Sequence, residues 1–497
     1  MTQDSKWTRQ LRYQAYEDWS NDYLDQLKEK VAHSPWRQHY HIQPETGLLN
    51  DPNGFSYYNG RWQLFYQYYP MGPVHGLKSW YHLSSKDLVH WEPHGLALAP
   101  DSFYDSHGVY SGSALPVDDQ LFLFYTGNAR DSDWQRHPYQ VGAWMDKDYQ
   151  FTKIDPPLIE AVEEGYTDHF RDPQLFPYQD GYLMILGAQS EDLKGQILVY
   201  QSDNLKDWEF LGPLKLTSGE SAYMMECPNY VKVDGKDLLI FCPQGLDQDE
   251  LKYQNIYPNT YLSSEAIDWE NLTLDEPSSL QHLDDGFDVY ATQAFNAPDG
   301  RALAVSWLGL PDLAYPDADY GWTSVLSLVK ELHFDQGHLY QRPVEEMESL
   351  RQTPIAIKET LESGQSWTYD PEDNAYEINC SLAADSKLNF LVMSDDQEAA
   401  ALHIEVDVPA GKVKATRTDQ GELVNPEYGQ VRESHFTGGE ELQLQIFIDA
   451  SSFEIFVQDG YKVLSGRIFP KKGQSQLIIK GSGRLWGEIY PLETINK

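Results

Sequence analysis

The chain has 497 residues, with 77 acidic and 37 basic side chains and a formal net charge of −40 at pH 7. This length exceeds what one hydrophobic core usually fills, so we expect two domains. The negative charge argues against nucleic acid and anionic membrane surfaces as partners, because both bind basic protein faces.

The N-terminal segment, residues 1–35, is predicted to be helical. Between residues 8 and 32, apolar side chains recur at helical spacing among charged ones, at Tyr16, Trp19, Tyr23, Leu27 and Val31. This pattern is typical of one amphipathic helix and not of a signal peptide. No apolar run approaches the roughly 20 residues of a membrane span. The three cysteines lack metal-ligand spacing and fit a reducing compartment, so we expect a soluble, cytoplasmic protein.

Residues 36–335 repeat one plan five times, and three of the repeats open with a carboxylate. The openings lie 54 to 65 residues apart and contain Asp51, Ser111, Asp172, Glu226 and Ala291. Each opening leads to a tight turn and then an apolar strand, and the turns are Asn59-Gly60, Asp118-Asp119, Asp180-Gly181, Asp234-Gly235 and Asp299-Gly300. Asn-Gly and Asp-Gly turns between apolar runs predict β-hairpins, and the regular period predicts a repeat architecture.

Five repeated meanders close radially into a β-propeller, which leaves only short, protected edges. A second repeated string contains Trp91, Trp208 and Trp269 at multiples of the same period, and these side chains are predicted to pack among outer strands. After a charged linker, residues 336–365, alternating apolar residues predict strands with one buried face. The predicted fold class is all-β: a five-bladed β-propeller, residues 36–335, followed by a C-terminal β-sandwich, residues 366–497, with a short N-terminal helix.

The three carboxylates are expected to converge, because equivalent strand starts surround the central channel of a propeller. Like charges in a small volume repel, and one group is driven to keep its proton. Such costly arrangements are usually kept for chemistry, and a protonated and an ionised carboxyl group together carry out glycoside hydrolysis. Three carboxylates could also hold a hard cation, but no metal-binding motif accompanies them. We expect neither a metal nor a cofactor.

Other catalytic classes have weaker support. Cys227 has no neighbouring base in the sequence and is expected to be a small structural residue. The string Ser111-Gly112-Ser113 is too short for a nucleophile elbow, and Ser111 is expected to hydrogen-bond a substrate hydroxyl. The sequence contains no phosphate-binding loop or dinucleotide fingerprint.

Three sequence blocks resemble those of a known family. Leu48 to Gly54, Arg171-Asp172-Pro173 and Glu226-Cys227-Pro228, in this order and spacing, resemble the signature blocks of glycoside hydrolase family 32, the β-fructofuranosidases. The likeness covers about residues 36–490. It implies a five-bladed propeller with a β-sandwich, and cleavage of a fructosyl bond with retention of configuration.

The resemblance also implies a role for each carboxylate. Asp51 would be the nucleophile, Glu226 the acid/base, and Asp172 the transition-state stabiliser that binds fructose hydroxyls together with Arg171. The residues implied to bind substrate lie in or near the same motifs and are Leu48, Leu49, Asn50, Gln67, Trp80, Tyr110, Ser111, Arg171 and Trp307.

Two further stretches, Tyr69 to Lys78 and Tyr125 to Pro138, resemble the bacterial family members that act on sucrose 6-phosphate. A phosphate would need a local cationic cradle in this acidic protein. The candidate cations are His75, Lys78, Arg130, Arg136 and His137. The other interpretation is that these are ordinary solvated loop charges.

The predicted activity is therefore hydrolysis of sucrose 6-phosphate, and of sucrose, with a small sugar as the only expected partner. Two alternatives stay open: the same chemistry on unphosphorylated sucrose or short fructans, and a carbohydrate-binding propeller without catalysis. Transfer of the fructosyl group to another sugar stays open as well. The sequence does not indicate an oligomeric state.

Overall fold

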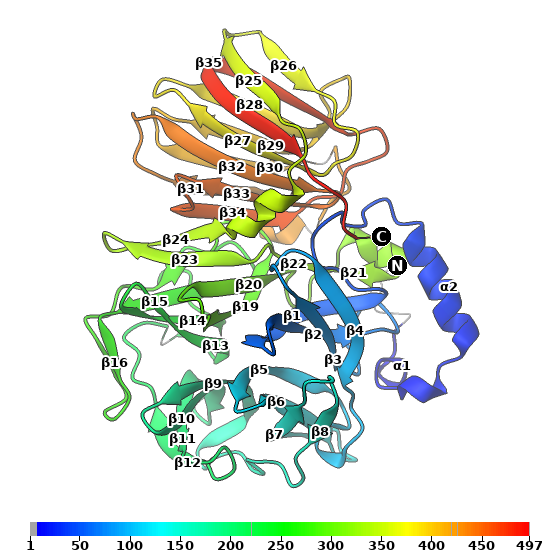
Figure 1. Cartoon of the computed structure of the whole chain (residues 1–497), viewed down its shortest axis with the longest axis vertical. Coiled ribbons are helices and arrows are strands. Elements are labelled where there is room, and N and C mark those ends of the chain that lie inside the picture. Colours follow the sequence, from blue (N-terminus) through cyan, green and yellow to red (C-terminus); the bar gives the residue numbers. More distant parts are fainter. Residues whose placement is uncertain (1–6, 220, 419, 425, 497) are drawn as a thin grey trace.

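The computed structural model describes residues 7–219, 221–418, 420–424 and 426–496. In this part of the chain, five small sheets form a propeller and the later strands form a separate layered domain (Figure 1). The predicted fold class is confirmed. Within the described ranges, no helix is long and apolar enough to cross a membrane.

Each blade of the propeller is an antiparallel sheet built around four consecutive main strands. The first two blades contain β1 (Gly47–Tyr58), β2 (Arg61–Tyr69), β3 (Ser79–Ser85), β4 (Trp91–Leu98), β5 (Val109–Val117), β6 (Gln120–Arg130), β7 (Arg136–Met145) and β8 (Phe151–Lys153). The third and fourth contain β9 (Tyr166–Tyr178), β10 (Gly181–Ser190), β11 (Gly195–Ser202), β12 (Glu209–Pro213), β13 (Met224–Val233), β14 (Lys236–Gln244), β15 (Thr260–Ser264) and β18 (Gln281–His282), and the hairpin β16 (Ala266–Asp268) and β17 (Thr273–Asp275) lies between the last two. The fifth contains β19 (Val289–Asn296), β20 (Ala302–Leu308), β23 (Lys330–Asp335) and β24 (His338–Pro343).

The innermost strands β1, β5, β9, β13 and β19 contact one another in a closed ring. Hydrogen bonds also close it, because β21 (Trp322–Thr323) pairs in parallel with β1, while β22 (Val325–Leu326) pairs with β20. The predicted hairpin turns join the first two strands of every blade. At Asn59 and Gly60, φ is 52° and 75°, a left-handed conformation that favours this residue pair.

The repeated tryptophans pack between blades. Trp208 stacks on Phe124 of the second blade with ring centres 5.5 Å apart, and Trp269 lies 5.2 Å from Phe176 of the third. Trp91 instead contacts Phe55 of its own blade, with ring centres 6.5 Å apart. Short 3-10 helices connect other strands: η3 (Phe103–Asp105), η4 (Pro316–Tyr320), η5 (Glu345–Leu350) and η6 (Pro426–Tyr428).

The prediction of one continuous helix over residues 8–32 is wrong. The segment contains α1 (Arg9–Arg12), η2 (Tyr16–Asp18) and α2 (Asn21–Ala32), and Ser20 starts α2 by accepting a hydrogen bond from the Tyr23 N–H. The helix breaks because aromatic side chains dock individually on the propeller. The Tyr16 hydroxyl, for example, donates to the Leu77 carbonyl. Residues 1–6 of this segment lie outside the described residues.

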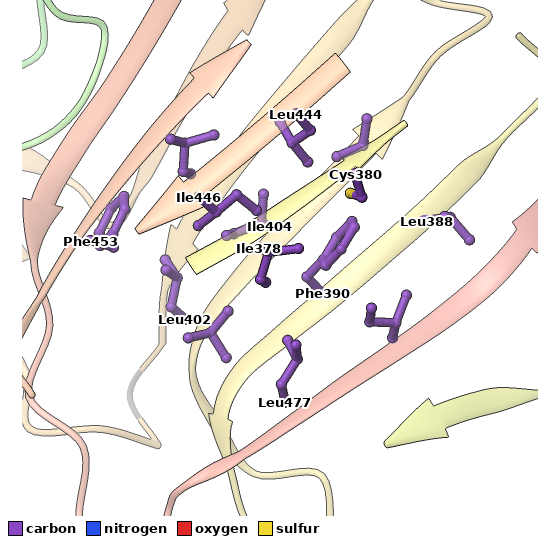
Figure 2. Close-up of a cluster of buried hydrophobic side chains, with 14 of the residues drawn as sticks. Ile378, Cys380, Leu388, Phe390, Leu402, Ile404, Leu444, Ile446, Phe453 and Leu477 are labelled. Atoms are coloured by element: carbon purple, nitrogen blue, oxygen red, sulfur yellow. The ribbon is translucent and has the colours of Figure 1, made fainter. Parts of the chain in front are cut away.

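Eleven strands form the C-terminal β-sandwich, and the long β35 (Gln476–Pro491) belongs to both of its sheets. The others are β25 (Ile355–Leu361), β26 (Ser366–Tyr369), β27 (Tyr376–Leu382), β28 (Lys387–Ser394), β29 (Ala400–Asp407), β30 (Lys412–Arg417), β31 (Val431–His435), β32 (Leu442–Asp449), β33 (Ser452–Val457) and β34 (Lys462–Arg467). Gly481 and Gly483, with φ of 136° and 142°, allow β35 to pass from one sheet to the other. Figure 2 shows the core, where Phe390, Ile404 and Ile446 belong to one buried apolar cluster.

Buried ion pairs join the sandwich to the propeller. Arg417 Nη1 donates to Asp288 Oδ2 at 2.7 Å, and Arg467 Nη2 donates to Asp317 Oδ2 at 2.8 Å. Both acids belong to the fifth repeat and both arginines to the sandwich. Because β24 pairs within the fifth blade and β25 within the sandwich, we propose that the domain boundary lies in residues 344–354.

Candidate active site

A β-bulge interrupts every innermost strand at the repeat opening. In each of the five blades, three residues of the inner strand stand against two of its neighbour, starting at Leu49, Val109, Arg171, Glu226 and Tyr290. A bulge bends its strand and changes the direction of its side chains. The five bulges therefore turn the side chains of the repeat openings toward one end of the central channel.

The three carboxylates occupy different positions within these bulges. Each bulge has three residues on the inner strand. Glu226 is the first residue of its bulge, Asp172 the second of its own, and Asp51 the third of its own. The expectation that they stand at matching positions is therefore wrong in detail, although they do converge. Asp172 has a left-handed φ of 68°, a strained conformation for a non-glycine residue that is often found at functional sites. The offset gives each acid a different set of partners.

Asp51 is held by two donors. Asn50 Nδ2 donates to its Oδ1 at 3.0 Å, and Ser111 Oγ donates to its Oδ2 at 2.5 Å. Gln67 ties these donors together, because its Oε1 accepts from Asn50 at 2.7 Å and its Nε2 donates to Ser111 at 2.6 Å. Lys78 Nζ also donates to Gln67 Oε1, at 2.6 Å. The carboxylate is thus oriented by side chains from two blades.

Asp172 is almost fully buried in the centre of the cluster. Its Oδ2 accepts a hydrogen bond from the Cys227 N–H at 3.0 Å, and Arg171 Nε lies 4.0 Å from the same oxygen. Burial raises the pKa of Asp172 to about 7; Arg171 opposes the rise, while the charges of Glu226 and Asp51 add to it. The cluster thus contains one carboxyl group that ionises much less readily than a solvated acid.

Glu226 is bound on both of its oxygens. Arg171 Nε and Nη2 donate to Oε1 at 3.0 and 2.7 Å, a two-pronged charged contact. Gln244 Nε2 and the Tyr290 hydroxyl donate to Oε2 at 2.7 and 2.6 Å. A hydroxyl group can also accept a hydrogen bond, so Tyr290 can remain bonded to Glu226 whether that acid is ionised or protonated.

The channel beneath the carboxylates is closed. Gln293, on β19, accepts from the Phe55 N–H at 2.7 Å and donates to the Gly112 carbonyl at 2.8 Å. The cavity remaining there has a volume of about 10 Å³, which is room for about one water molecule. The space beneath the acids is therefore too small for a sugar.

The structure does not bring every predicted binding residue to this funnel. Leu49 and Trp80 are fully buried in hydrophobic clusters, and Leu48 is nearly so. The Trp80 indole N–H donates to the Tyr110 carbonyl oxygen at 2.9 Å. These three side chains belong to the hydrophobic core around the site. Trp307 is also buried, with its ring 6.2 Å from that of His75.

The five predicted phosphate-binding residues separate into distinct environments. His75 is partly buried, and burial, with Lys78 and Arg12 adding to it, lowers its pKa well below the ordinary value, which disfavours its charged form. His137 is exposed and lies 3.0 Å from Asp131 Oδ2. Lys78 belongs to the Gln67 network, where burial lowers its pKa although Asp51 opposes that change. Arg130 and Arg136 pair directly across β6 and β7.

These two arginines lack acidic partners. Across the described ranges, neither guanidinium group forms an ion pair, and the Nε atoms of both are buried without a hydrogen-bond partner. The bond that fixes Arg130 runs from its Nη1 to the Trp134 carbonyl oxygen at 2.9 Å. Burial lowers the pKa of His169 to about 4, and Arg171 and Arg136 add to the fall; a ring nitrogen of His169 lies 3.0 Å from Arg171 Nη1. Arg136 lies on β7, which packs against β9, the strand that carries Arg171 and Asp172.

Two partners of Glu226 were not predicted. Tyr290 lies in the fifth repeat opening, where the period could have indicated it. Gln244 ends β14 and carries no motif, because its contact depends on the pairing of β14 with β13. In the described part of the chain, no group of three or more His, Cys, Asp or Glu side chains is arranged to hold a metal ion.

Two family models match the chain. The N-terminal domain model of glycosyl hydrolases family 32 matches residues 41–343, and the C-terminal model of the same family matches residues 346–484. Together they span both the propeller and the sandwich.

Several known proteins are similar over nearly their whole length. A sucrose-6-phosphate hydrolase of Pediococcus pentosaceus is 46% identical over 485 residues, which cover 97% of this chain and 96% of that protein. Its counterpart from Streptococcus mutans is 47% identical over 486 residues, covering 97% and 98%. The solved structure of a sucrose-6-phosphate hydrolase from Lactobacillus gasseri has a TM-score of 0.94 and 44% identity, covering 98% of this chain and all of that one. A Bombyx mori β-fructofuranosidase has a TM-score of 0.83 and 30% identity, covering 97% and 99%.

Proposed function

The chain belongs to glycosyl hydrolase family 32, and from this membership we propose that it is a retaining β-fructofuranosidase that hydrolyses sucrose 6-phosphate, and also sucrose. The products are fructose with glucose 6-phosphate or glucose. The observation that carries the proposal is the convergence of Asp51, Asp172 and Glu226 in one closed-ended funnel, each with different hydrogen-bond partners.

In the first step Asp51 attacks the anomeric carbon of the fructosyl unit. The bond from this carbon to the glycosidic oxygen breaks as its bond to the Asp51 carboxylate forms. Protonated Glu226 gives its proton to the leaving oxygen. Asn50 and Ser111 hold Asp51 in a fixed orientation, which favours attack because little reorganisation is needed.

In the second step water releases the fructosyl group. Glu226, now ionised, takes a proton from a water molecule whose oxygen bonds to the anomeric carbon, and the bond to Asp51 breaks. Arg171 and Tyr290 stabilise the ionised Glu226 between the two steps. Asp172 binds fructose hydroxyls and, when ionised, stabilises positive charge on the sugar ring.

The phosphate on the leaving glucose binds Arg130 and Arg136. The two residues pair directly across neighbouring strands and, within the described ranges, neither forms an ion pair, although the protein carries a net charge of −40. Planar guanidinium groups fit phosphate oxygens in pairs. The lowered pKa of His75 disfavours its charged form and His137 already contacts an acid, so these two contribute less. A phosphorylated sugar and three free cysteines fit a cytoplasmic location.

Kinetics with the two sucroses test this function. We expect kcat/KM to be higher for sucrose 6-phosphate than for sucrose, and Arg130→Gln or Arg136→Gln to lower the ratio of the two values by roughly 10- to 100-fold. Arg61→Gln, which alters a surface arginine of the first blade paired with Glu92, is the matched control. Equal kcat/KM values for both substrates in the unmodified protein would reject the phosphate subsite.

Turnover itself is tested by Glu226→Gln. We expect released glucose to fall by at least about 100-fold, the contribution of a general acid, while the thermal unfolding temperature is kept. Full activity of this variant would reject the assigned proton donor. Absence of any glucose release by the unmodified protein would instead favour a carbohydrate-binding propeller, and fructosyl oligomers formed at high sucrose concentration would reveal transfer.

A further inference from the structure

The N-terminal segment docks beside the funnel. The Leu77 N–H donates to the Arg12 carbonyl at 2.7 Å, and the Tyr69 hydroxyl donates to the Leu11 carbonyl at 3.1 Å. These contacts join α1 to the loop between β2 and β3, which leads directly into Lys78 (Figure 1). A single turn of helix is thereby held against the first blade.

Two glycines in this loop make the docking possible. A Cβ atom on Gly72 would lie 2.0 Å from the Trp7 ring, and one on Gly76 would lie 2.6 Å from the Arg12 carbonyl oxygen. Such separations do not occur between real atoms, so any other residue would displace the segment. The two glycines therefore leave the space that the N-terminal segment fills.

The segment also reaches the second blade, through Trp134. The guanidinium carbons of Arg9 and Arg130 lie 4.6 and 5.1 Å from the centre of the Trp134 ring. The Tyr13 ring meets this indole edge-on at 5.1 Å. Trp134 has a left-handed φ of 69°, which is unusual for a bulky residue. One strained tryptophan thus fixes Arg130 and the N-terminal segment relative to each other.

Tyr13 lies close to the unpaired cations. Burial raises its pKa to about 12, the neighbouring Tyr110 adds to the rise, and Arg130 and Arg136 oppose it. Tyr110 in turn precedes Ser111 and lies under Lys78, whose Nζ is 5.8 Å from the Tyr110 ring centre. Within the described ranges the Tyr13 hydroxyl has no hydrogen-bond partner. The Tyr13 ring and the Arg130 guanidinium group therefore contact the same Trp134 ring, and the Tyr13 hydroxyl is free to donate.

We propose that the N-terminal segment completes the phosphate subsite, with the Tyr13 hydroxyl binding the phosphate alongside Arg130 and Arg136. Trp134 acts as a positioning residue that holds the Arg130 side chain in place. This inference rests on the proposed function. A neutral phenol suits the role, because it donates a hydrogen bond to a phosphate oxygen without adding charge.

The substitution Tyr13→Phe removes only this hydroxyl. We expect the ratio of kcat/KM for sucrose 6-phosphate to that for sucrose to fall about 10-fold, chiefly through KM, because a hydrogen bond to a charged group is lost. The inhibition constant of glucose 6-phosphate should rise by a similar factor and that of glucose should not. The control is Tyr139→Phe. Tyr139 lies on the face of β7 opposite to Arg136 and packs on Tyr104. This variant should leave the ratio unchanged.

Trp134 is tested by Trp134→Ala and Trp134→Phe. We expect the alanine variant to lower the substrate ratio at least as much as Tyr13→Phe does, and the phenylalanine variant to recover part of it, since a ring still packs against Arg130. A merely structural role would lower kcat for both sucroses equally and would leave their ratio unchanged.

The outcomes distinguish this inference from the proposed function. If Tyr13→Phe leaves the ratio unchanged while Arg130→Gln lowers it, the segment is a structural clamp and the inference is wrong. If the arginine variants also leave the ratio unchanged, the phosphate subsite itself is wrong. Hydrolysis of sucrose by each variant shows that the protein has folded, so both results can be interpreted.

Discussion

The funnel of the propeller and the interface with the sandwich both bury carboxylates, but they neutralise them differently. At the interface, Asp288 and Asp317 each receive a guanidinium group from the sandwich at 2.7 and 2.8 Å. In the funnel, three acids gather around Arg171, which pairs closely with Glu226 alone, and Lys78, which donates to Gln67 and not to an acid. The funnel therefore holds an excess of negative charge that the interface does not.

The pKa shifts of the buried acids also differ between the interface and the funnel. Burial raises the pKa of Asp317, and Arg467 and Thr323 oppose the rise. Burial also raises the pKa of Asp172, but there two neighbouring acids add to the rise. Matched charges are what a structural interface needs, whereas unmatched acids lower stability and are usually kept for chemistry. Substitutions should therefore have opposite effects on activity and stability in the two regions.

The largest effect is expected from Asp51→Asn. Loss of the proposed nucleophile should lower kcat by at least about 10⁴-fold. The thermal unfolding temperature should stay the same or rise, since one of three crowded charges is removed while the side-chain shape is kept. Glucose release and a melting curve measure the two quantities, and Asp180→Asn at an exposed turn is the control. A large drop in the melting temperature would make Asp51 a structural residue like those of the interface.

Arg467→Met should produce the reverse pattern. The Arg467 side chain is fully buried, and its loss leaves Asp317 without its cation, which typically costs about 3 to 5 kcal/mol. Unfolding by urea measures this, and kcat of the folded variant should change less than about 2-fold. Arg342→Met removes an exposed pair with Asp459 and should cost less than about 1 kcal/mol. Equal costs for the two variants would contradict the role given to the buried pair.

The regular period of the sequence accounts for much of the architecture. Five turns and five apolar strands predict the blades, and the repeat openings predict that Asp51, Asp172 and Glu226 converge. The bulges were not predictable, because one extra residue per inner strand is visible only against its partner strand. They decide which way each acid points. Leu49 and Trp80 were expected to bind substrate for the same reason: proximity to a motif does not show which face a side chain occupies.

Contacts between distant segments also could not be predicted from the sequence. The position of Gln244 against Glu226 depends on the pairing of two strands. The break between α1 and α2 depends on docking sites for Tyr13 and Tyr16 on the propeller. Helical periodicity reports which residues are apolar, but it does not report that their binding surfaces lie in different directions.

The pH dependence of stability should come partly from the interface. Burial lowers the pKa of His41, but hydrogen bonds to Asp449 and Glu454 outweigh it and raise the pKa to about 9. This group therefore stabilises the fold fully below pH 6.5, and the stabilisation is lost as the pH rises through 9. A shift from 6.5 to about 9 corresponds to roughly 3 kcal/mol. His41→Gln should flatten the fall in urea stability between pH 6.5 and 9.5, and an unchanged slope would show that other groups cause it.

Asp172→Asn should raise stability at neutral pH, whereas Arg467→Met at the interface should lower it. Because the folded pKa of Asp172 is raised to about 7, its protonated form favours folding at low pH, and this contribution is lost as the pH rises through 7. The asparagine variant stays neutral and still accepts the Cys227 N–H. It should match the unmodified protein at pH 4 and have a higher unfolding free energy at pH 8, by up to the roughly 4 kcal/mol that a shift from 3.8 to about 7 corresponds to. A variant less stable at pH 8 would mean that Arg171 compensates the charge of Asp172, in which case the funnel is neutralised as fully as the interface.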